Sequence, residues 1–141
     1  MEYENTFSLK FSALSSNESF ARMAVSIFLI QYDPLNEIVS DIKTAVSEAV
    51  TNCIIHGYEN EKGDIDLNCA VKDNVLYIEI ADYGKGIENV ELAMEPLYTT
   101  KPDEERSGLG FTVMKSFMDS VEVKSRKGYG TRVFMKKSLL R

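Results

Sequence analysis

The sequence is poor in cysteine and histidine and contains no tryptophan. Its 141 residues include two cysteines and one histidine, His56. Cys53 and Cys69 stand far apart among apolar residues, so we expect reduced packing thiols of a cytoplasmic protein rather than a disulfide. With so few sulfur and imidazole ligands, neither a zinc cluster nor a Cys-His catalytic pair is expected.

Long apolar runs and an excess of positive charge are also missing. No run approaches the length of a membrane span, and the opening Met-Glu-Tyr-Glu-Asn has no basic segment before an apolar stretch, so we expect no membrane contact and no signal peptide. The formal net charge is −6, whereas a general nucleic-acid binder needs a basic footprint. Acidic residues crowd positions 88–105 and basic residues positions 124–141. We interpret these clusters as two solvated faces or as a protein-docking surface of opposed signs.

The order of apolar patterns predicts an α+β fold. Alternation of apolar and polar residues is typical of half-buried strands, and apolar residues recur at helical spacing between the alternating segments. This order favours helices packed on one face of a mostly antiparallel mixed sheet, that is, a two-layer α/β sandwich. A chain of this length fits one domain, residues 1–141. The predicted elements are strands at 7–12, 65–71, 76–82, 121–123 and 133–135, and helices at 15–32, 35–56, 90–94 and from 107.

The first predicted helix opens with a capping box formed by Ser15 and Glu18. Arg22 falls outside its apolar stripe, where the side chain would be solvated or would contact a partner. The residues predicted to be buried are Phe20, Met23, Ala24, Ile27 and Phe28.

The second predicted helix combines an apolar stripe with two polar residues that lie one turn apart. Glu48 and Asn52 are four positions apart, so they share a polar face. A carboxylate and a carboxamide placed in this way can hold a metal ion and a water between them. By itself the spacing is more often a solvated helix face. The predicted apolar stripe is Val46, Ala49, Val50, Cys53 and Ile54.

The first glycine-rich motif follows the predicted strand that ends at Asp82. Gly84 and Gly86 permit a positive φ angle and let a flat ligand come close to the backbone. The Asp82 carboxylate could accept a hydrogen bond from an exocyclic amine such as that of adenine. The same residues also favour an ordinary turn.

A second glycine-rich motif opens the predicted helix after residue 106, where free backbone N–H groups and the helix dipole suit a phosphate. Thr99, Thr100 and Lys101 could add hydroxyls and a cation, and the planar fork of Arg106 suits a terminal phosphate. An ordinary capped helix is the alternative. Neither a P-loop nor a Rossmann motif is present. The second motif reads Ser107-Gly108-Leu109-Gly110.

Three segments of the chain, taken in this order, resemble the N, G1 and G2 boxes of the ATPase superfamily that includes gyrase, Hsp90, histidine kinases and MutL. They are the helix with Glu48 and Asn52, the motif at Asp82, Gly84 and Gly86, and the motif Ser107–Gly110 with the residues Thr99–Lys101 before it. Within this superfamily the chain is similar to the anti-sigma factor serine kinases, and to their sporulation branch in particular. The resemblance covers nearly the whole chain. The segments that carry the closer resemblance are residues 11–15, 17–22, 47–52, 54–58, 99–102 and 105–108.

The resemblance implies a Bergerat-type GHKL fold that binds ATP and Mg²⁺. Asn52 would ligate Mg²⁺ through its side-chain oxygen, and Asp82 would read the adenine amine. Gly84 and Gly86 would shape the base pocket, and Thr131 would face it. One departure is Tyr83, because a small or acidic residue is more usual at that position.

The resemblance also implies how the phosphates are held and transferred. Residues 87–106 would form the ATP lid, and Thr100 would lie near the phosphates. Glu48 would be the general base that accepts the proton of an incoming serine hydroxyl, and Arg106 would neutralise charge on the transferred phosphoryl group. The residues implied to hold the phosphates are Ser107, Gly108, Leu109 and Gly110.

The partners that the resemblance implies are proteins. An ATP-bound homodimer would sequester a sporulation sigma factor of the sigma-F type. An unphosphorylated STAS-type anti-anti-sigma factor would displace the sigma factor and would then be phosphorylated on a serine, and Arg22 would contact one of these partners. The alternatives are a stress-response sigma factor as partner, an ATP-sensing binding module without kinase activity, and a catalytic fragment of a histidine kinase. Glu48 and Arg106 speak against a pure binding module, because binding alone needs neither.

Overall fold

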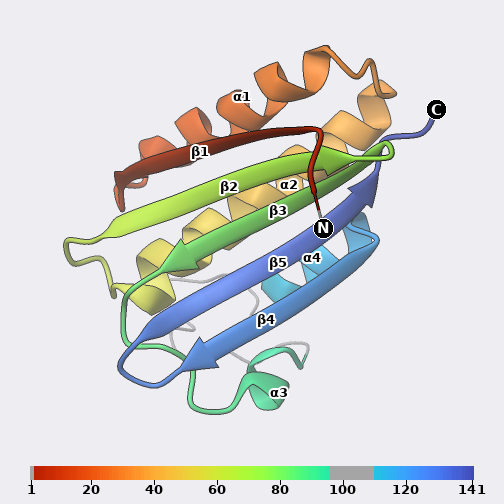
Figure 1. The fold of residues 1–141 in the computed structure, drawn as a ribbon. Coiled ribbons are helices and arrows are strands. Elements are labelled where there is room, and N and C mark those ends of the chain that lie inside the picture. The colour runs from red at the N-terminus through yellow and green to blue at the C-terminus, as the bar shows by residue number, and fades with distance from the viewer. Residues whose placement is uncertain (1, 96–109) are drawn as a thin grey trace.

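A computed structural model describes residues 2–95 and 110–141 as two layers, a five-stranded sheet with helices over one of its faces (Figure 1). This confirms the predicted α+β sandwich. The described elements, in chain order, are β1 (Asn5–Ser12), α1 (Asn17–Ile30), α2 (Asn36–Asn52), a π-helical turn (Cys53–Gly57), β2 (Asp64–Lys72), β3 (Val75–Asp82), α3 (Val90–Ala93), α4 (Gly110–Phe117), β4 (Ser120–Arg126) and β5 (Gly130–Ser138).

The strand order is β1-β2-β3-β5-β4, and every pairing among the described residues is antiparallel. No parallel pair occurs among the described strands, so the sheet is antiparallel rather than mixed. Short turns, which suffice for antiparallel neighbours, join β2 to β3 and β4 to β5, whereas α1 and α2 lie between β1 and β2 in the chain. Asp73 and Asn74 join β2 to β3 with φ angles of 51° and 59°, as predicted for a turn at 72–74.

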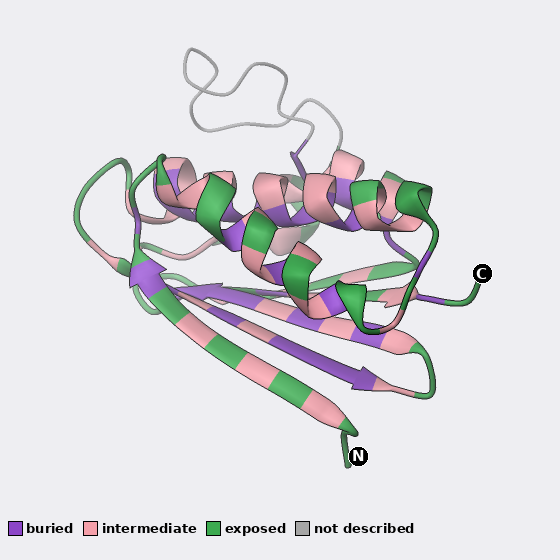
Figure 2. Ribbon diagram, turned by 90° about the horizontal axis from the view of Figure 1, so that it is seen from above, coloured by how far each residue is buried: buried purple, intermediate pink, exposed green. Residues whose placement is uncertain are grey.

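The core lies between the sheet and the helices, where the buried faces of both layers meet (Figure 2). On α2 and the turn that follows, the predicted apolar stripe is confirmed, since all five of its residues are buried. The inward-facing residues of β2 and β3 alternate with outward-facing ones, as half-buried strands require. Large side chains with almost no exposed surface include Leu29, Ile42, Ile65, Leu67, Leu76, Ile78, Ile80, Met114 and Met135.

The predicted buried stripe of α1 is wrong. The buried face consists of Ala21, Val25 and Leu29, and of the predicted five only Phe28 and Ala24 are even partly buried. The helix carries apolar residues on two faces, and helical periodicity alone cannot decide which face meets the sheet. The exposed face is formed by Phe20, Met23, Ile27 and Ile30, with exposed fractions between 50% and 73%.

The predicted capping box at the start of α1 is also wrong. The N-cap residue is Ser16, and its side chain makes no capping hydrogen bond. The Glu18 carboxylate instead accepts a hydrogen bond from the hydroxyl of Ser47 on α2 and lies 2.8 Å from Nε of Arg22. A contact between two helices has therefore replaced the local cap.

The helix that carries Glu48 and Asn52 ends as predicted near Gly57, but its last turn is π-helical. The amide of Tyr58 donates to the carbonyl oxygen of Cys53 over 2.9 Å, which is the wider i to i+5 spacing. Single π-helical turns of this kind occur frequently at functional sites. None of the helices in the described ranges is long and apolar enough to cross a membrane.

Candidate functional site

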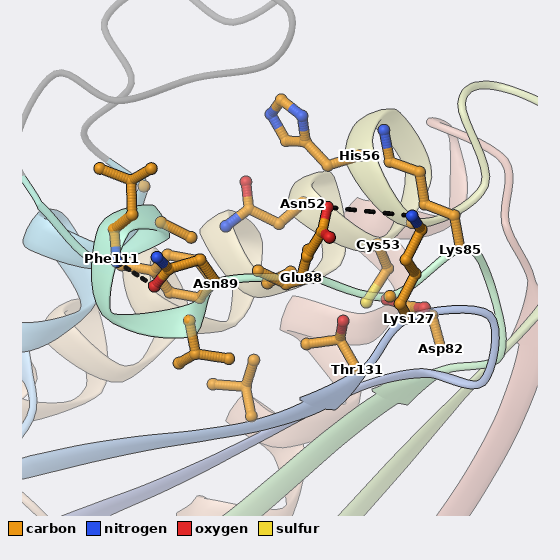
Figure 3. Close-up of a pocket in the computed structure, with 18 of the residues that line it drawn as sticks. Asn52, Cys53, His56, Asp82, Lys85, Glu88, Asn89, Phe111, Lys127 and Thr131 are labelled. Atoms are coloured by element: carbon orange, nitrogen blue, oxygen red, sulfur yellow. Dashed lines mark hydrogen bonds and ion pairs between the residues drawn. The ribbon is translucent and has the colours of Figure 1, made fainter.

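A cavity of ≈ 910 Å³ lies at the end of the sheet where β3 stops and β5 starts (Figure 3). The end of α2, its π-helical turn, α3 and the start of α4 complete its walls. Its volume falls within the range of about 300–1,000 Å³ that is usual for small-molecule sites. The described residues that line it include Asn52, Cys53, His56, Asp82, Lys85, Gly86, Glu88, Phe111, Gly110, Lys127 and Thr131.

Asp82 is the buried carboxylate of this cavity, with 4% of its surface exposed. It is the last residue of β3 and pairs in register with Thr131 on β5, so both side chains point to the same face of the sheet. The carboxylate accepts a hydrogen bond of 2.9 Å from the Gly84 amide. This donor helps to orient a charged group that burial would otherwise disfavour.

Burial and hydrogen bonding act on the Asp82 carboxyl in opposite directions. Desolvation by burial is the larger effect and raises its pKa above the ordinary value, while the donors from Gly84, Cys53 and Thr131 lower it. The pKa of the neighbouring Cys53 thiol is also raised, well above its ordinary value. Burial is the larger cause, and the negative charge of Asp82 is the second. Cys53 is therefore a protonated hydrogen-bond donor and not a reactive thiolate.

Close backbone packing holds the loop after β3 against the end of the helical segment. A Cβ atom at Gly84 would lie 2.0 Å from the carbonyl oxygen of Gly57, and one at Gly57 would lie 2.6 Å from Oδ2 of Asp82. Gly86 has a φ angle of 75°, and a Cβ atom there would lie 2.1 Å from the carbonyl oxygen of Arg126. These glycines are needed for contact between distant segments of the backbone, whereas the sequence suggested only turns and ligand access.

The hairpin of β4 and β5 supports the start of the predicted lid. The Ser125 hydroxyl lies 2.8 Å from the Thr131 hydroxyl and accepts a hydrogen bond of 2.7 Å from the Ile87 amide. The Gly128 amide also donates to the carbonyl oxygen of Lys85 over 2.6 Å. The segment that leaves Gly86 is therefore attached to this hairpin before α3 begins.

Two ion pairs stand at the rim of the cavity. Lys127 lies 3.9 Å from Glu88 (Figure 3), and Lys85 lies 3.9 Å from Glu59. All four side chains are exposed, so each pair contributes little to stability. Tyr83 points elsewhere, because its hydroxyl donates to Asp66 on β2 and its side chain does not line this cavity.

The structure brings several of the predicted site residues to the cavity and leaves others away from it. Glu48 lies one turn before Asn52 on α2, partly buried, and neither it nor Gly84 lines the cavity. Sequence reasoning missed Cys53, which it assigned to packing alone, and Lys127, which only long-range contacts bring here. The predicted residues that line the cavity are Asn52, Asp82, Gly86, Gly110 and Thr131. Thr99, Thr100, Lys101, Arg106, Ser107, Gly108 and Leu109 lie outside the described residues.

Arg22 lies on α1, outside the cavity. Its Nε atom makes an ionic contact of 2.8 Å with Glu18 Oε1 that lacks the alignment of a good hydrogen bond, and its Nη2 donates to the Ser19 hydroxyl at 3.1 Å. About a third of its side chain remains exposed, at 35%. A guanidinium held in this way keeps part of its donor edge available to a second molecule.

A resident metal ion would find few protein ligands here. Residues 2–95 and 110–141 contain no group of three or more histidine, cysteine, aspartate or glutamate side chains placed to share an ion. Mg²⁺ keeps several waters and often takes only one or two protein ligands plus substrate phosphates. The side-chain oxygen of Asn52 in the cavity wall fits that second kind of site.

Comparison with known proteins identifies the family. Residues 11–137 match the family described as the histidine kinase-like ATPase domain. The anti-sigma F factor of Clostridium acetobutylicum is 58% identical over 134 residues, which is 95% of this chain and 94% of that protein. The anti-sigma F factors of Caldanaerobacter subterraneus and Clostridium kluyveri are 58% and 53% identical, and each alignment covers at least 95% of both chains.

Solved structures agree on the fold. A crystal structure of the RsbU and RsbW domains of a Mycobacterium tuberculosis protein has a TM-score of 0.71 at 18% identity, and the match covers 97% of this chain and 33% of that longer chain. The nucleotide-free catalytic domain of the histidine kinase ThkA has a TM-score of 0.58 at 15% identity, covering 99% and 97%. At these identities the likeness concerns the fold alone.

Proposed function

The chain belongs to the histidine kinase-like ATPase domain family, and from this membership we propose that it is an anti-sigma factor and an ATP-dependent protein serine kinase. Relatives that are 53% to 58% identical over nearly their whole length are named anti-sigma F factor, which favours the sporulation branch over the stress-response branch. The observation that carries the proposal is the cavity, because Asn52, Asp82 and Thr131 reach it from three separate elements.

ATP would lie with its base at Asp82 and its phosphates toward Asn52 and the start of α4. An ionised carboxylate accepts hydrogen bonds only, so Asp82 suits the adenine amine, which donates. Gly110 is the first residue of α4 and lines the cavity, and the free amides of such a helix start suit phosphate. In this proposal residues 1–141 form one ATPase domain and residues 87–106 its lid. Thr99, Thr100, Lys101, Ser107, Gly108 and Leu109 would complete the phosphate site.

Mg²⁺ would be held by the Asn52 side-chain oxygen together with phosphate oxygens and water. When bound, the ion neutralises the charge that develops on the phosphates during transfer. What the chain supplies is an oxygen ligand held on a helix whose inner face is packed into the core. A ligand on a rigid element keeps its position during the reaction.

Glu48 would act as the general base, because it lies one turn from Asn52 and faces the same side of α2. It would accept the proton of a serine hydroxyl on the protein substrate while that oxygen bonds to the γ-phosphorus and the bond to ADP breaks. Arg106 would stabilise the negative charge on the phosphoryl group in transit. Loss of an arginine in this role reduces the rate by on the order of a thousandfold in other phosphoryl-transfer enzymes.

The partners would be a sigma factor of the sigma-F type and a STAS-type anti-anti-sigma factor that carries the serine. Arg22 would contact them through the part of its guanidinium that Glu18 and Ser19 leave exposed. A homodimer is part of the proposal. The exposed apolar face of α1, formed by Phe20, Met23, Ile27 and Ile30, supports it, since contiguous exposed apolar surface usually marks an interaction site.

The test of the proposed function is a phosphoryl-transfer assay with purified proteins. The protein is mixed with Mg²⁺, γ-labelled ATP and a STAS-type anti-anti-sigma factor, and phosphoserine on the partner is measured. We expect phosphoserine with the unmodified protein and none with Glu48→Gln, while both bind ATP. ATP binding without transfer by the unmodified protein would reject the kinase and leave a nucleotide-dependent binding module. Transfer by Glu48→Gln at an undiminished rate would remove Glu48 from its role.

A further inference from the structure

We infer that the hairpin of β4 and β5 carries, on the face of the sheet that the helices leave uncovered, a docking surface for an acidic, extended segment of a partner protein (Figure 1). This surface is separate from Arg22 on α1, where the proposed sigma-factor contact is made, and it does not depend on ATP binding. It gives a role to two features that the proposed function leaves unused, Tyr83 and the basic cluster near the C-terminus.

Positive charge gathers on the uncovered face of this hairpin. Along β4 and β5, the residues that alternate with those facing the helices point away from the core. Within these two described strands they are four cations, Lys124, Arg126, Arg132 and Lys136, and one carboxylate, Glu122. Lys124 and Arg132 lie directly opposite each other in the strand register. On a chain with a net charge of −6, this local excess of cations attracts an anionic partner.

A hollow of ≈ 420 Å³ lies beside the end of this basic stripe, where β3 stops and β5 starts. Its lining includes two tyrosines and three of the cations. The tyrosines are 51% and 68% exposed. Tyrosine and arginine are the residues that are enriched at the centres of protein interfaces, so this composition suits a protein partner. The residues concerned are Tyr83, Tyr129, Lys124, Arg126 and Arg132.

Arg126 is the cation of this hollow that has no acidic partner among the described residues. Arg132 pairs with Glu79 at 3.1 Å, and Lys124 has a longer ion pair of 3.8 Å. The Cζ atom of Arg126 instead lies 4.5 Å from the centre of the Tyr129 ring. This stacking holds the guanidinium in place and leaves its N–H donors available. A planar group held in this way is suited to bidentate pairing with a carboxylate.

The free edge of the sheet explains why the partner segment would be extended. β4 is the last strand in the order β1-β2-β3-β5-β4, and within the described ranges its outer backbone groups bond to no further strand. An extended peptide can add to such an edge and pair with these groups. Alternate side chains of that peptide would point to the uncovered face, where carboxylates would meet the basic stripe.

A single-stranded nucleic acid is the competing occupant, because rings beside cations also suit stacked bases and phosphates. The net charge of −6 repels a long phosphate backbone. A short acidic segment carries fewer charges and meets less of this repulsion. The acidic peptide is therefore favoured, and the nucleic acid becomes an outcome of the test.

The test is an NMR titration of the isotope-labelled protein with a synthetic peptide of about ten residues, the length of a long strand, in which glutamate and threonine alternate. The control ligands are the same peptide with lysine in place of glutamate and an oligothymidylate of similar length. Shifts of the backbone amides report where each ligand binds, and their concentration dependence gives the dissociation constant. Melting temperatures establish that each variant is folded.

We expect the acidic peptide to bind and to shift amides of β4 and β5. Arg126→Ala should weaken this binding by at least about tenfold, the size of a hydrogen-bonded contact between charged groups. Arg126→Lys keeps the charge but loses the planar fork, so most of that loss should remain. Tyr129→Ala should weaken binding by about threefold, the size of an exposed cation–π contact, whereas Tyr129→Phe should not. Lys10→Ala is the matched control, because Lys10 lies on the same face of the sheet but on β1, and it should keep full affinity.

Several results would overturn the docking surface. They are failure of the acidic peptide to bind, binding away from the hairpin, equal binding of the lysine peptide, and tighter binding of the oligothymidylate at the same amides. Full affinity in Arg126→Lys would also overturn it, since charge alone would then suffice. If Arg126→Ala does not fold, Arg126→Lys and the two Tyr129 variants decide.

ATP titrations by calorimetry separate this result from the proposed function. Tyr129→Ala should bind ATP as tightly as the unmodified protein does. Failure of the unmodified protein to bind ATP would reject the proposed function and leave the docking surface standing. Normal ATP binding without peptide binding would reject the docking surface alone.

Discussion

The backbone amide of Lys85 donates a hydrogen bond of 3.0 Å to the carbonyl oxygen of Gly57. This bond joins the loop after β3 to the end of the helical segment that carries Asn52. The two walls of the cavity, one with Asp82 and one with Asn52, are thereby held at a fixed separation. A ligand that contacts both walls would depend on this junction, since small displacements of contacting groups reduce binding and rate strongly.

Gly84→Ala tests the junction directly. The added Cβ atom would lie 2.0 Å from the Gly57 carbonyl oxygen, and neither backbone can yield without breaking the Lys85 bond. We expect a loss of stability of about 1–3 kcal/mol, as for overpacked sites, and a loss of ATP affinity, measured by denaturant unfolding and calorimetry. Gly128→Ala is the control, because a Cβ atom there meets nothing within 4 Å. It should cost about 1–2 kcal/mol through its left-handed backbone and keep ATP affinity. Equal ATP affinity in both variants would show that the junction does not support the site.

Asn52→Ala should weaken the binding of Mg-ATP more than the binding of ATP in the presence of a chelator. The reason is that Asn52 is proposed to contribute a side-chain oxygen to the ion, while Asp82 is proposed to hold the base. Calorimetric titrations with and without Mg²⁺ measure the difference, which we expect to be at least about tenfold, as for lost hydrogen bonds to charged groups. Asn68→Ala is the control, since Asn68 lies on β2 and bonds to Glu79. If Asn52→Ala weakens binding to the same extent in both conditions, Asn52 is not a ligand of the ion.

Helical periodicity predicted the helix around Asn52 and its buried face, but it selected the wrong face of α1. On α2 the apolar residues form one stripe, so the pattern has a single solution. On α1 the small residues Ala21 and Val25 are buried and the large Phe20 and Ile27 are exposed. A sequence pattern assigns large apolar side chains to the core. On α1 the large side chains Phe20 and Ile27 are instead exposed and available for contact with another protein surface.

The contacts that build the cavity could not be predicted from local patterns. Cys53 meets Asp82, and Gly57 meets Gly84, across almost thirty residues of chain. The order of the strands in the sheet brings these segments together. Residue spacing within a single helix or strand carries no information about such a contact. Local patterns marked Asn52 and Asp82 as candidates beside ordinary structural alternatives, whereas Thr131 was identified only through the resemblance to a family.

The acidity of Asp82 predicts a pH dependence of ATP binding. Its folded-state pKa is raised, chiefly by burial, and the adenine amine needs the ionised form as acceptor. ATP affinity should therefore fall as the pH falls through this raised pKa, at a higher pH than for an ordinary aspartate. The contribution of this group to folding runs the other way. It is present below the unfolded-state pKa and is lost as the pH rises through the folded one.

Calorimetric ATP titrations across acidic pH, together with unfolding curves of the nucleotide-free protein, measure both trends. Asp82→Asn provides the control, because the phosphates of ATP also titrate and their effect persists in that variant. The same pH dependence in both proteins would mean that Asp82 does not determine it.

Ile27→Lys tests the exposed face of α1 as a surface for self-association. Ile27 is 62% exposed, so a charge there should leave folding nearly unchanged. Inserted into an apolar interface, the same charge should raise the dimer dissociation constant by at least about tenfold, as measured by analytical ultracentrifugation. Leu140→Lys is the matched control, since Leu140 is 63% exposed and lies outside α1. A dimer that withstands Ile27→Lys but not Leu140→Lys would place the interface elsewhere.

The most direct test of the whole account is a crystal structure of the protein with Mg²⁺ and a non-hydrolysable ATP analogue. We predict that the adenine amine nitrogen lies about 3 Å from an Asp82 carboxylate oxygen. We also predict that the ion lies about 2.1 Å from the Asn52 side-chain oxygen. A nucleotide bound elsewhere, or bound in this cavity with its base away from Asp82, would contradict it.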